Sequence, residues 1–155
     1  MSHRHMIAVG VAVAAMLTAL AQPLWIRASG DDVALAIRPV DPLSLFRGNY
    51  VDLTYDVQVE VPATMEGGDV AYVVFDGARP ANALRVSASR PTLAAGETCV
   101  RGEVLAGERV AFPSLEQYFV TPEEGARLEG QLSTMVSIVR TTGSCRAILV
   151  AIEPR

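Results

Sequence analysis

The stretch from Met6 to Ile26 is the strongest constraint on this chain, because it holds 21 consecutive residues without a charge. As an α-helix with a rise of about 1.5 Å per residue, it is about 30 Å long and matches the hydrocarbon thickness of a bilayer. Arg4 precedes it and Asp31 follows it, which favours a cytoplasmic N-terminus. We therefore expect a cytoplasmic tail over 1–5, a transmembrane signal anchor over 6–26 and an exported domain after it.

A cleaved secretory signal is the alternative interpretation of the same stretch. Ala19-Leu20-Ala21 fits the A-x-A cleavage pattern. Cleavage there would leave the apolar residues Pro23 to Ile26 exposed near a new N-terminus, and the apolar run is longer than a usual signal peptide requires. We favour retention in the bacterial cytoplasmic (inner) membrane. On either interpretation the C-terminal domain is periplasmic or extracellular.

Small residues line one face of the predicted anchor. Gly10, Ala14 and Thr18 are spaced four apart, and Gln22 lies one turn further. Such a stripe lets two helices approach closely, so a homo-oligomer that packs through this face is one hypothesis. An alanine-rich helix without a protein partner shows the same stripe by chance, and this second interpretation is favoured.

Apolar residues after the anchor recur with the period of two that is typical of strands. A polar linker over 27–32 is expected first. The predicted strands are 33–38, 50–61, 70–75, 84–89 and 98–105, with a final hairpin of 132–140 and 145–152. Thr121 and Glu124 have the spacing of a capping box for one short helix that ends near Gly130. The expected fold over 33–155 is an all-β small barrel or sandwich, mainly antiparallel, with one short helix.

Two cysteines, Cys99 and Cys145, are the only ones in the chain. An even count in an exported domain favours a disulfide, and each cysteine begins a predicted strand. Two unpaired thiols are the alternative.

Composition excludes several kinds of chemistry. There is no lysine, and both histidines, His3 and His5, precede the anchor. An exported Ser-His-Asp, Cys-His or Ser-Lys arrangement is therefore impossible within this chain. Two cysteines are too few for a usual zinc site, so neither a metal nor a cofactor is expected. All 17 acidic residues lie at or after Asp31, which argues against nucleic acid as a partner.

The segment from Pro39 to Tyr55 carries the most specific motif. It contains Gly48, Asn49, Tyr50, Leu53 and Tyr55. In this spacing it resembles the signature of the GDYXXLXY family, a group of bacterial membrane-anchored proteins, with Asn49 in place of the motif's aspartate. Tyr118 to Val120 is similar to a later segment of that family. The resemblance implies an envelope protein, often associated with polytopic membrane proteins, and it implies no reaction.

Elementary stereochemistry explains part of this motif. Gly48 permits a positive φ, while Leu53 and Tyr55 are expected to point into the core. Tyr50 is expected on the opposite, polar face. We therefore take Tyr50 as a candidate partner-binding residue, together with Asp41, Arg47 and Asn49, because Arg and Tyr are favoured at interface hot spots. The alternative is a structural corner in which Arg47 stacks on Tyr50 or pairs with Asp41.

The leading functional hypothesis is a non-enzymatic envelope protein whose exported β-domain binds another membrane protein, with the lipid bilayer as its second partner. A carboxylate-based hydrolase or a glycan-binding domain that acts on envelope polymers stays open, because the spatial pairing of acids is not visible in a sequence. A self-associating structural protein is the third hypothesis.

Overall fold

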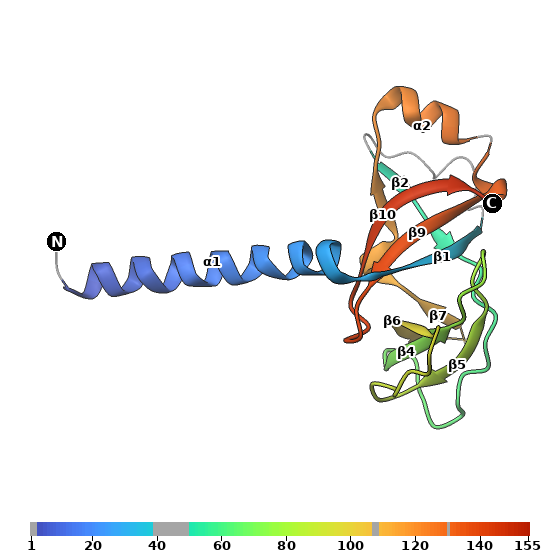
Figure 1. The fold of residues 1–155 in the computed structure, drawn as a ribbon, viewed down its shortest axis with the longest axis horizontal. Helices are drawn as coiled ribbons and strands as arrows, with labels where there is room; N and C mark the ends of the chain where they lie inside the picture. The colour runs from blue at the N-terminus through green and yellow to red at the C-terminus, as the bar shows by residue number, and fades with distance from the viewer. Residues whose placement is uncertain (1–2, 39–49, 107–108, 130) are drawn as a thin grey trace.

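A computed structural model describes residues 3–38, 50–106, 109–129 and 131–155 of the chain. One long helix projects from a β-rich domain, and the N-terminus lies at the far end of that helix (Figure 1). The domain consists mostly of antiparallel sheets that form a half-barrel. The expected class, an all-β domain preceded by one apolar helix, is confirmed.

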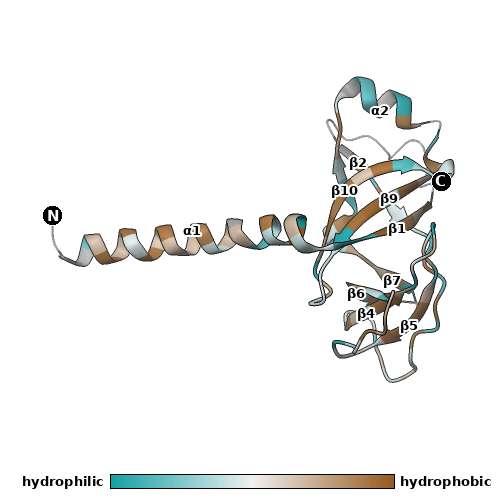
Figure 2. Cartoon of the chain, viewed as in Figure 1, coloured by the Kyte–Doolittle hydropathy of each residue, from teal (hydrophilic) through white to brown (hydrophobic). Residues whose placement is uncertain are grey.

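Helix α1 (His3–Ser29) is long and apolar enough to span a membrane from His5 to Ser29. Figure 2 shows that hydrophobic or near-neutral residues cover most of its length. Its large apolar side chains are exposed, among them Leu17 at 62% and Leu24 at 64%. A helix that exposes such side chains all round finds its apolar environment outside the protein.

The structure does not have the polar linker expected over 27–32. Helix α1 continues to Ser29, and strand β1 (Asp31–Arg38) begins after Gly30 alone. A Cβ added to Gly30 would lie 2.6 Å from Cγ of Arg140 and 2.7 Å from the Thr141 carbonyl oxygen, so only glycine fits this close approach. Polar composition predicted a loop, whereas tertiary contacts hold these residues in regular structure.

A single arginine fixes the junction between helix and sheet. Arg140 forms a bidentate ion pair with Asp32, with its Nε 2.6 Å from one carboxylate oxygen. Its Nη1 donates to the Arg27 carbonyl oxygen at 2.8 Å, which satisfies one of the free carbonyls at the helix end. Helix α1 is therefore joined directly to the domain, with no flexible linker between α1 and β1.

The first sheet has the order β10-β9-β1-β3. Strands β9 (Met135–Thr141) and β10 (Ala147–Pro154) form the C-terminal hairpin, and β1 pairs with β9 along six residues. Strand β3 (Thr54–Tyr55) pairs with the end of β1. The second sheet has the order β5-β4-β6-β7.

The strands of the second sheet are β4 (Val70–Phe75), β5 (Ala83–Ser87), β6 (Thr98–Leu105) and β7 (Arg109–Ala111). A ribbon of β2 (Tyr50–Asp52) and β8 (Gln117–Phe119) joins the two parts. Helix α2 (Pro122–Glu129) and the 3-10 turns η1 (Pro113–Leu115) and η2 (Leu132–Thr134) complete the fold.

One hydrophobic core is shared by both sheets. Leu35 of β1, Val73 of β4 and Val100 of β6 are each at most 1% exposed and belong to the same cluster. Both sheets thus turn their apolar faces toward each other, as in a sandwich or an open barrel.

The prediction of one continuous strand over 50–61 is wrong, because the structure has two short strands, β2 and β3, in its first half. The chain pairs with β8 as β2, changes partner at Leu53, and pairs with β1 as β3. No strand follows over residues 56–61. The alternation of burial nevertheless continues to Val61, which is 4% exposed. The alternating pattern of apolar residues predicted which side chains are buried. It did not predict that the chain leaves one sheet and joins another at Leu53.

Other boundaries differ by a few residues. The strands predicted at 70–75 and 98–105 are found with the same bounds. The final hairpin begins at Met135 because 132–134 is a 3-10 turn. Helix α2 begins as predicted, since the Glu124 amide donates to the Thr121 hydroxyl at 3.3 Å.

Cys99 and Cys145 form a disulfide, and their Cα atoms are 4.8 Å apart. It joins β6 of the second sheet to the turn between β9 and β10. The Arg101 amide also donates to the Cys145 carbonyl oxygen at 2.8 Å, and the Thr141 hydroxyl donates to the Cys99 carbonyl oxygen. Both sulfur-bearing residues are fully buried. The pairing favoured from the sequence is therefore present.

Replacing both Cys99 and Cys145 by serine is expected to lower the free energy of unfolding by about 4 kcal/mol, because the bridge closes a loop with a sequence separation of 46. Denaturant unfolding of the full chain in detergent measures this change. A reducing agent should destabilise the native protein similarly and leave the double variant unchanged. Equal stability of oxidised and reduced native protein would contradict the prediction.

Candidate binding cleft

The family-like motif continues into the buried floor of a cleft. Leu53 is 2% exposed, and the ring of Tyr55 packs edge-on against Phe112 with centroids 5.9 Å apart. The Tyr55 hydroxyl donates to the Leu115 carbonyl oxygen at 2.6 Å. Burial raises the pKa of the Tyr55 phenol, so the group remains a neutral donor. Tyr55 thus ties β3 to the segment that follows β7.

The cleft has a volume of about 500 Å³ and lies between two chain segments. Residues 52–57 line one wall, and residues 109–113 with Glu116 and Gln117 line the other. The walls meet where the Leu53 amide donates to the Glu116 carbonyl oxygen at 2.7 Å. Among the described residues, β3 pairs only with β1 and β7 only with β6, so each wall includes the edge strand of one sheet.

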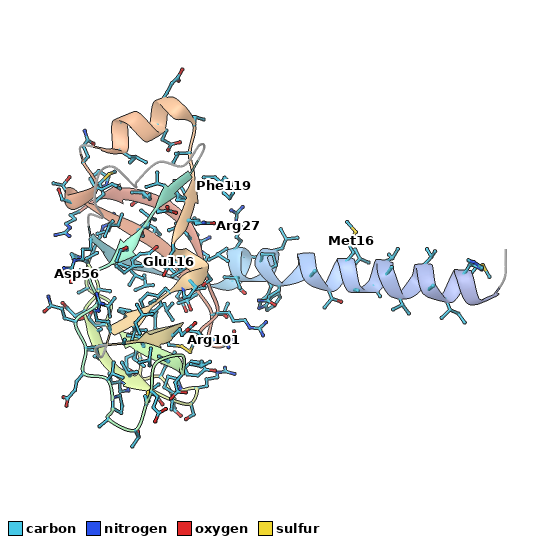
Figure 3. The ribbon with its side chains drawn as sticks, turned by 180° about the vertical axis from the view of Figure 1, so that it is seen from behind. Met16, Arg27, Asp56, Arg101, Glu116 and Phe119 are labelled. Carbon is cyan, nitrogen blue, oxygen red and sulfur yellow. A yellow bond between two sulfur atoms is a disulfide. The ribbon has the colours of Figure 1, made fainter. Side chains whose placement is uncertain are left out.

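Charges of both signs surround the apolar floor. Arg38 and Arg109 contribute positive charge, while Asp52, Asp56 and Glu116 contribute negative charge. Burial raises the pKa of the Glu116 carboxyl, and the nearby carboxylates of Asp52 and Glu103 raise it further. Figure 3 shows Asp56 on the side of the domain opposite α1, with Glu116 nearer the middle.

Three of the predicted partner-binding residues, Asp41, Arg47 and Asn49, lie outside the described residues, as does Gly48 of the motif. The backbone of Tyr50 is described and pairs with Phe119 in the β2–β8 ribbon. Leu53 and Tyr55 are buried in the core, where the sequence predicted them. The cleft begins two residues after Tyr50.

Sequence reasoning missed the wall opposite the motif. Arg109 and Glu116 lie in or beside strands of only three residues, β7 and β8, which are too short to show a period. Their position depends on pairing with β6 and β2. The one available signal was the acid at 116 directly after the apolar Leu115, and it did not indicate a partner segment.

The stripe of small residues on α1 faces outward. Gly10, Ala14 and Thr18 are exposed, and an added Cβ at Gly10 would meet no atom within 4 Å. The Thr18 hydroxyl donates to the Ala14 carbonyl oxygen of its own helix at 2.8 Å. Helix pairing through this face remains a prediction.

Across the described ranges, no three His, Cys, Asp or Glu residues gather closely enough to hold a metal ion.

These features define a protein with an N-terminal helix that is long and apolar enough to span a membrane. The helix is joined directly to a disulfide-bonded β-domain that carries a cleft. A family model described as "GDYXXLXY protein" matches residues 12–152, and the chain therefore belongs to the GDYXXLXY family. No curated protein and no solved structure matches the chain.

Replacing Tyr55 by phenylalanine is expected to lower the free energy of unfolding by about 1–3 kcal/mol, because the buried Leu115 carbonyl loses its donor. Thermal or denaturant unfolding of the full chain measures the loss. Tyr118→Phe, at a half-buried tyrosine of β8, serves as the control and should change stability less. Equal effects of the two substitutions would contradict the assigned role of Tyr55.

Replacing Glu116 by glutamine is expected to stabilise the protein at pH 7 by less than about 1 kcal/mol, because a partly buried charge is removed from beside other carboxylates. The raised pKa means that the native Glu116 binds its proton more tightly than the unfolded chain does. Its favourable contribution is present at pH below about 4.5 and is lost as the pH rises through the native pKa.

Unfolding followed from pH 3 to pH 8 should therefore show the two proteins converging in acid and separating toward neutrality. Glu60→Gln, at an exposed position outside the cleft, is the matched control. A constant difference at every pH would show that ionisation of Glu116 is not the cause.

Proposed function

We propose that this protein is a membrane-anchored component of the bacterial envelope that acts by binding rather than by catalysis. In this proposal α1 spans the cytoplasmic (inner) membrane with residues 1–5 inside, and the β-domain lies in the periplasm or outside the cell. The domain binds an extended extracytoplasmic segment of another membrane protein in the cleft beside β3.

The edge strands that flank the cleft are the observation that carries this proposal. Strands β3 and β7 are the outer strands of their sheets, and both line the cleft. An outer strand presents backbone donors and acceptors to which an extended peptide adds as a further strand. Phe112 and Tyr55 between them provide an apolar floor for alternate side chains of the bound segment.

The rim of the cleft favours a peptide over a uniformly charged ligand. Two arginines and three carboxylates line it, so neither a polyanion nor a polycation meets a complementary surface. A peptide with mixed charges and an apolar side chain between them fits both the rim and the floor.

Composition supports a function without catalysis. The only histidines are His3 and His5, before the apolar stretch, and lysine is absent from the chain. The commonest general base and the usual amine nucleophile are therefore missing from the β-domain. The disulfide agrees with the proposed location, because such bonds persist in oxidising compartments.

A second candidate function rests on Glu116. Its pKa is raised by burial and then by Asp52, which is the kind of carboxylate environment that a glycosidase uses for its acid. A carboxylate-based hydrolase or glycan-binding domain would then act on envelope polymers. Glu116→Gln separates the two candidates, because it should abolish turnover of a glycan but retain most of the binding of a peptide.

Site-specific photo-crosslinking in cells tests the proposed function. A photoreactive residue at Thr54 or Arg109, both exposed beside the cleft, should crosslink one and the same membrane protein. Leu84, which is 49% exposed on the outer strand β5, is the matched control and should not give this product. Asp56→Arg should reduce the yield by about tenfold, as expected for the loss of about 1.4 kcal/mol at a charged rim.

Glu60→Arg introduces the same charge on the same segment but outside the cleft lining, and should leave the yield unchanged. Absence of a product that is specific to Thr54 and Arg109 would exclude the cleft as a site for a membrane-protein partner.

A further inference from the structure

A second hollow of about 540 Å³ lies where α1 meets the β-domain. Gln22 and Trp25 of the helix line one side of it. Arg90, Arg101 and Arg146 line the other, with hydroxyl groups from the turn between β9 and β10. No acidic residue lines this hollow.

The three arginines of this hollow have no acidic partner in the described part of the chain. Ion pairs are found there for Arg79, Arg85 and Arg140, and for none of the three arginines of the hollow. In a chain with a formal net charge of −4, three guanidinium groups without an acidic partner in one hollow form a local site of the opposite sign.

Contacts between distant parts of the chain position Arg101 and Arg146, and Arg90 lies near the turn between β9 and β10. The Arg101 amide donates to the Cys145 carbonyl oxygen at 2.8 Å, beside the disulfide that precedes Arg146. Nη1 of Arg146 donates to Oε1 of Gln22 at 2.6 Å and so reaches the helix itself. A guanidinium nitrogen of Arg90 lies 3.9 Å from the position of an added Cβ at Gly143.

The position of the hollow along α1 indicates which layer of a bilayer it would contact. The uncharged stretch begins at Met6, and with a rise of about 1.5 Å per residue Gln22 to Ile26 lie about 24–30 Å further on, at the edge of a hydrocarbon layer. Trp25 is 69% exposed, as expected for a ring at the membrane interface. Phosphate groups of lipids occupy this level in a bilayer.

We infer that the hollow binds the phosphate headgroup of an anionic phospholipid from the outer leaflet of the membrane that α1 spans. Arg90, Arg101 and Arg146 pair with the headgroup, and the acyl chains extend along the exposed apolar surface of α1 at Leu17 and Leu24. The inference rests on the membrane-spanning part of the proposed function and does not depend on the cleft.

Two further residues lie on the same side of the domain. Figure 3 shows Arg27, Arg101 and Phe119 on the side from which α1 leaves, and Phe119 is 75% exposed. An additional arginine and an exposed aromatic ring next to the bilayer suit the interface between headgroups and acyl chains. The lipid therefore bridges α1 and the side of the β-domain that faces the membrane.

The single tryptophan of the chain, Trp25, provides a direct measurement, because it lines the hollow. The full chain is placed in two kinds of phosphatidylcholine nanodisc. One contains a small fraction of phosphatidylglycerol with brominated acyl chains, and the other contains the same fraction of phosphatidylcholine with brominated acyl chains. The brominated phosphatidylglycerol is expected to quench Trp25 fluorescence several-fold more strongly. Added salt should weaken this preference, because the contact is ionic.

Arg101→Gln with Arg146→Gln is expected to reduce the preference for phosphatidylglycerol by about fivefold for each arginine removed. Arg127→Gln with Arg155→Gln removes the same charge at exposed positions away from the hollow, and should keep the preference. Arg90→Gln is a milder variant of an exposed side chain that should reduce the preference without a change in unfolding temperature.

Equal quenching by both lipids in the native protein would overturn the inference while leaving the helix in the bilayer. Quenching by neither lipid would overturn it together with the membrane-spanning part of the proposed function. Loss of the preference on addition of millimolar inorganic phosphate would assign the hollow to free phosphate instead of lipid. Displacement by an acidic peptide alone would assign it to a protein partner. The crosslinks at Thr54 test the cleft independently of all these outcomes.

Discussion

The close contact at Gly30 is the constraint on which the rest of the structure depends. Helix α1 ends one residue before β1, and Arg140 connects the Arg27 carbonyl with the Asp32 carboxylate across that residue. Because β1 lies inside the first sheet and contributes to the shared core, the orientation of the helix is fixed to the whole domain. The helix is thus part of the folded unit and not a flexible tether.

Both candidate sites follow from how the two sheets are joined. On one side the chain changes its pairing partner from β8 to β1 at Leu53, and the residues around Leu53 line the cleft. On the other side the disulfide holds β6 to the β9–β10 turn, next to α1. Asp56 of the cleft lies opposite the helix, whereas the arginine-lined hollow lies against the helix. The two proposals therefore assign different ligands, a protein segment and a lipid, to different sides of one domain.

The sequence predicted those parts of the fold that depend on local patterns. Uncharged length predicted α1, alternation predicted β4 and β6 with their bounds, and a capping box predicted α2. It could not predict the helix-to-strand junction, because the ion pair that holds it joins residues 108 apart. Of the cleft, the sequence indicated only the wall that contains Leu53 and Tyr55. Its other wall consists of short segments whose place is set by long-range pairing.

The disulfide also imposes an order of events on the proposed topology. Cys145 lies 116 residues after the end of α1, so the whole second sheet must cross the membrane before Cys99 can meet its partner. Until then only hydrogen bonds, such as the one from the Arg101 amide to the Cys145 carbonyl oxygen, join the strand that carries Arg101 to the turn that carries Arg146. In the proposed topology, the covalent bond beside the arginine-lined hollow therefore forms only after export. A chain that had not yet been exported would lack this bond, so the proposed lipid site would reach its full stability only on the far side of the membrane.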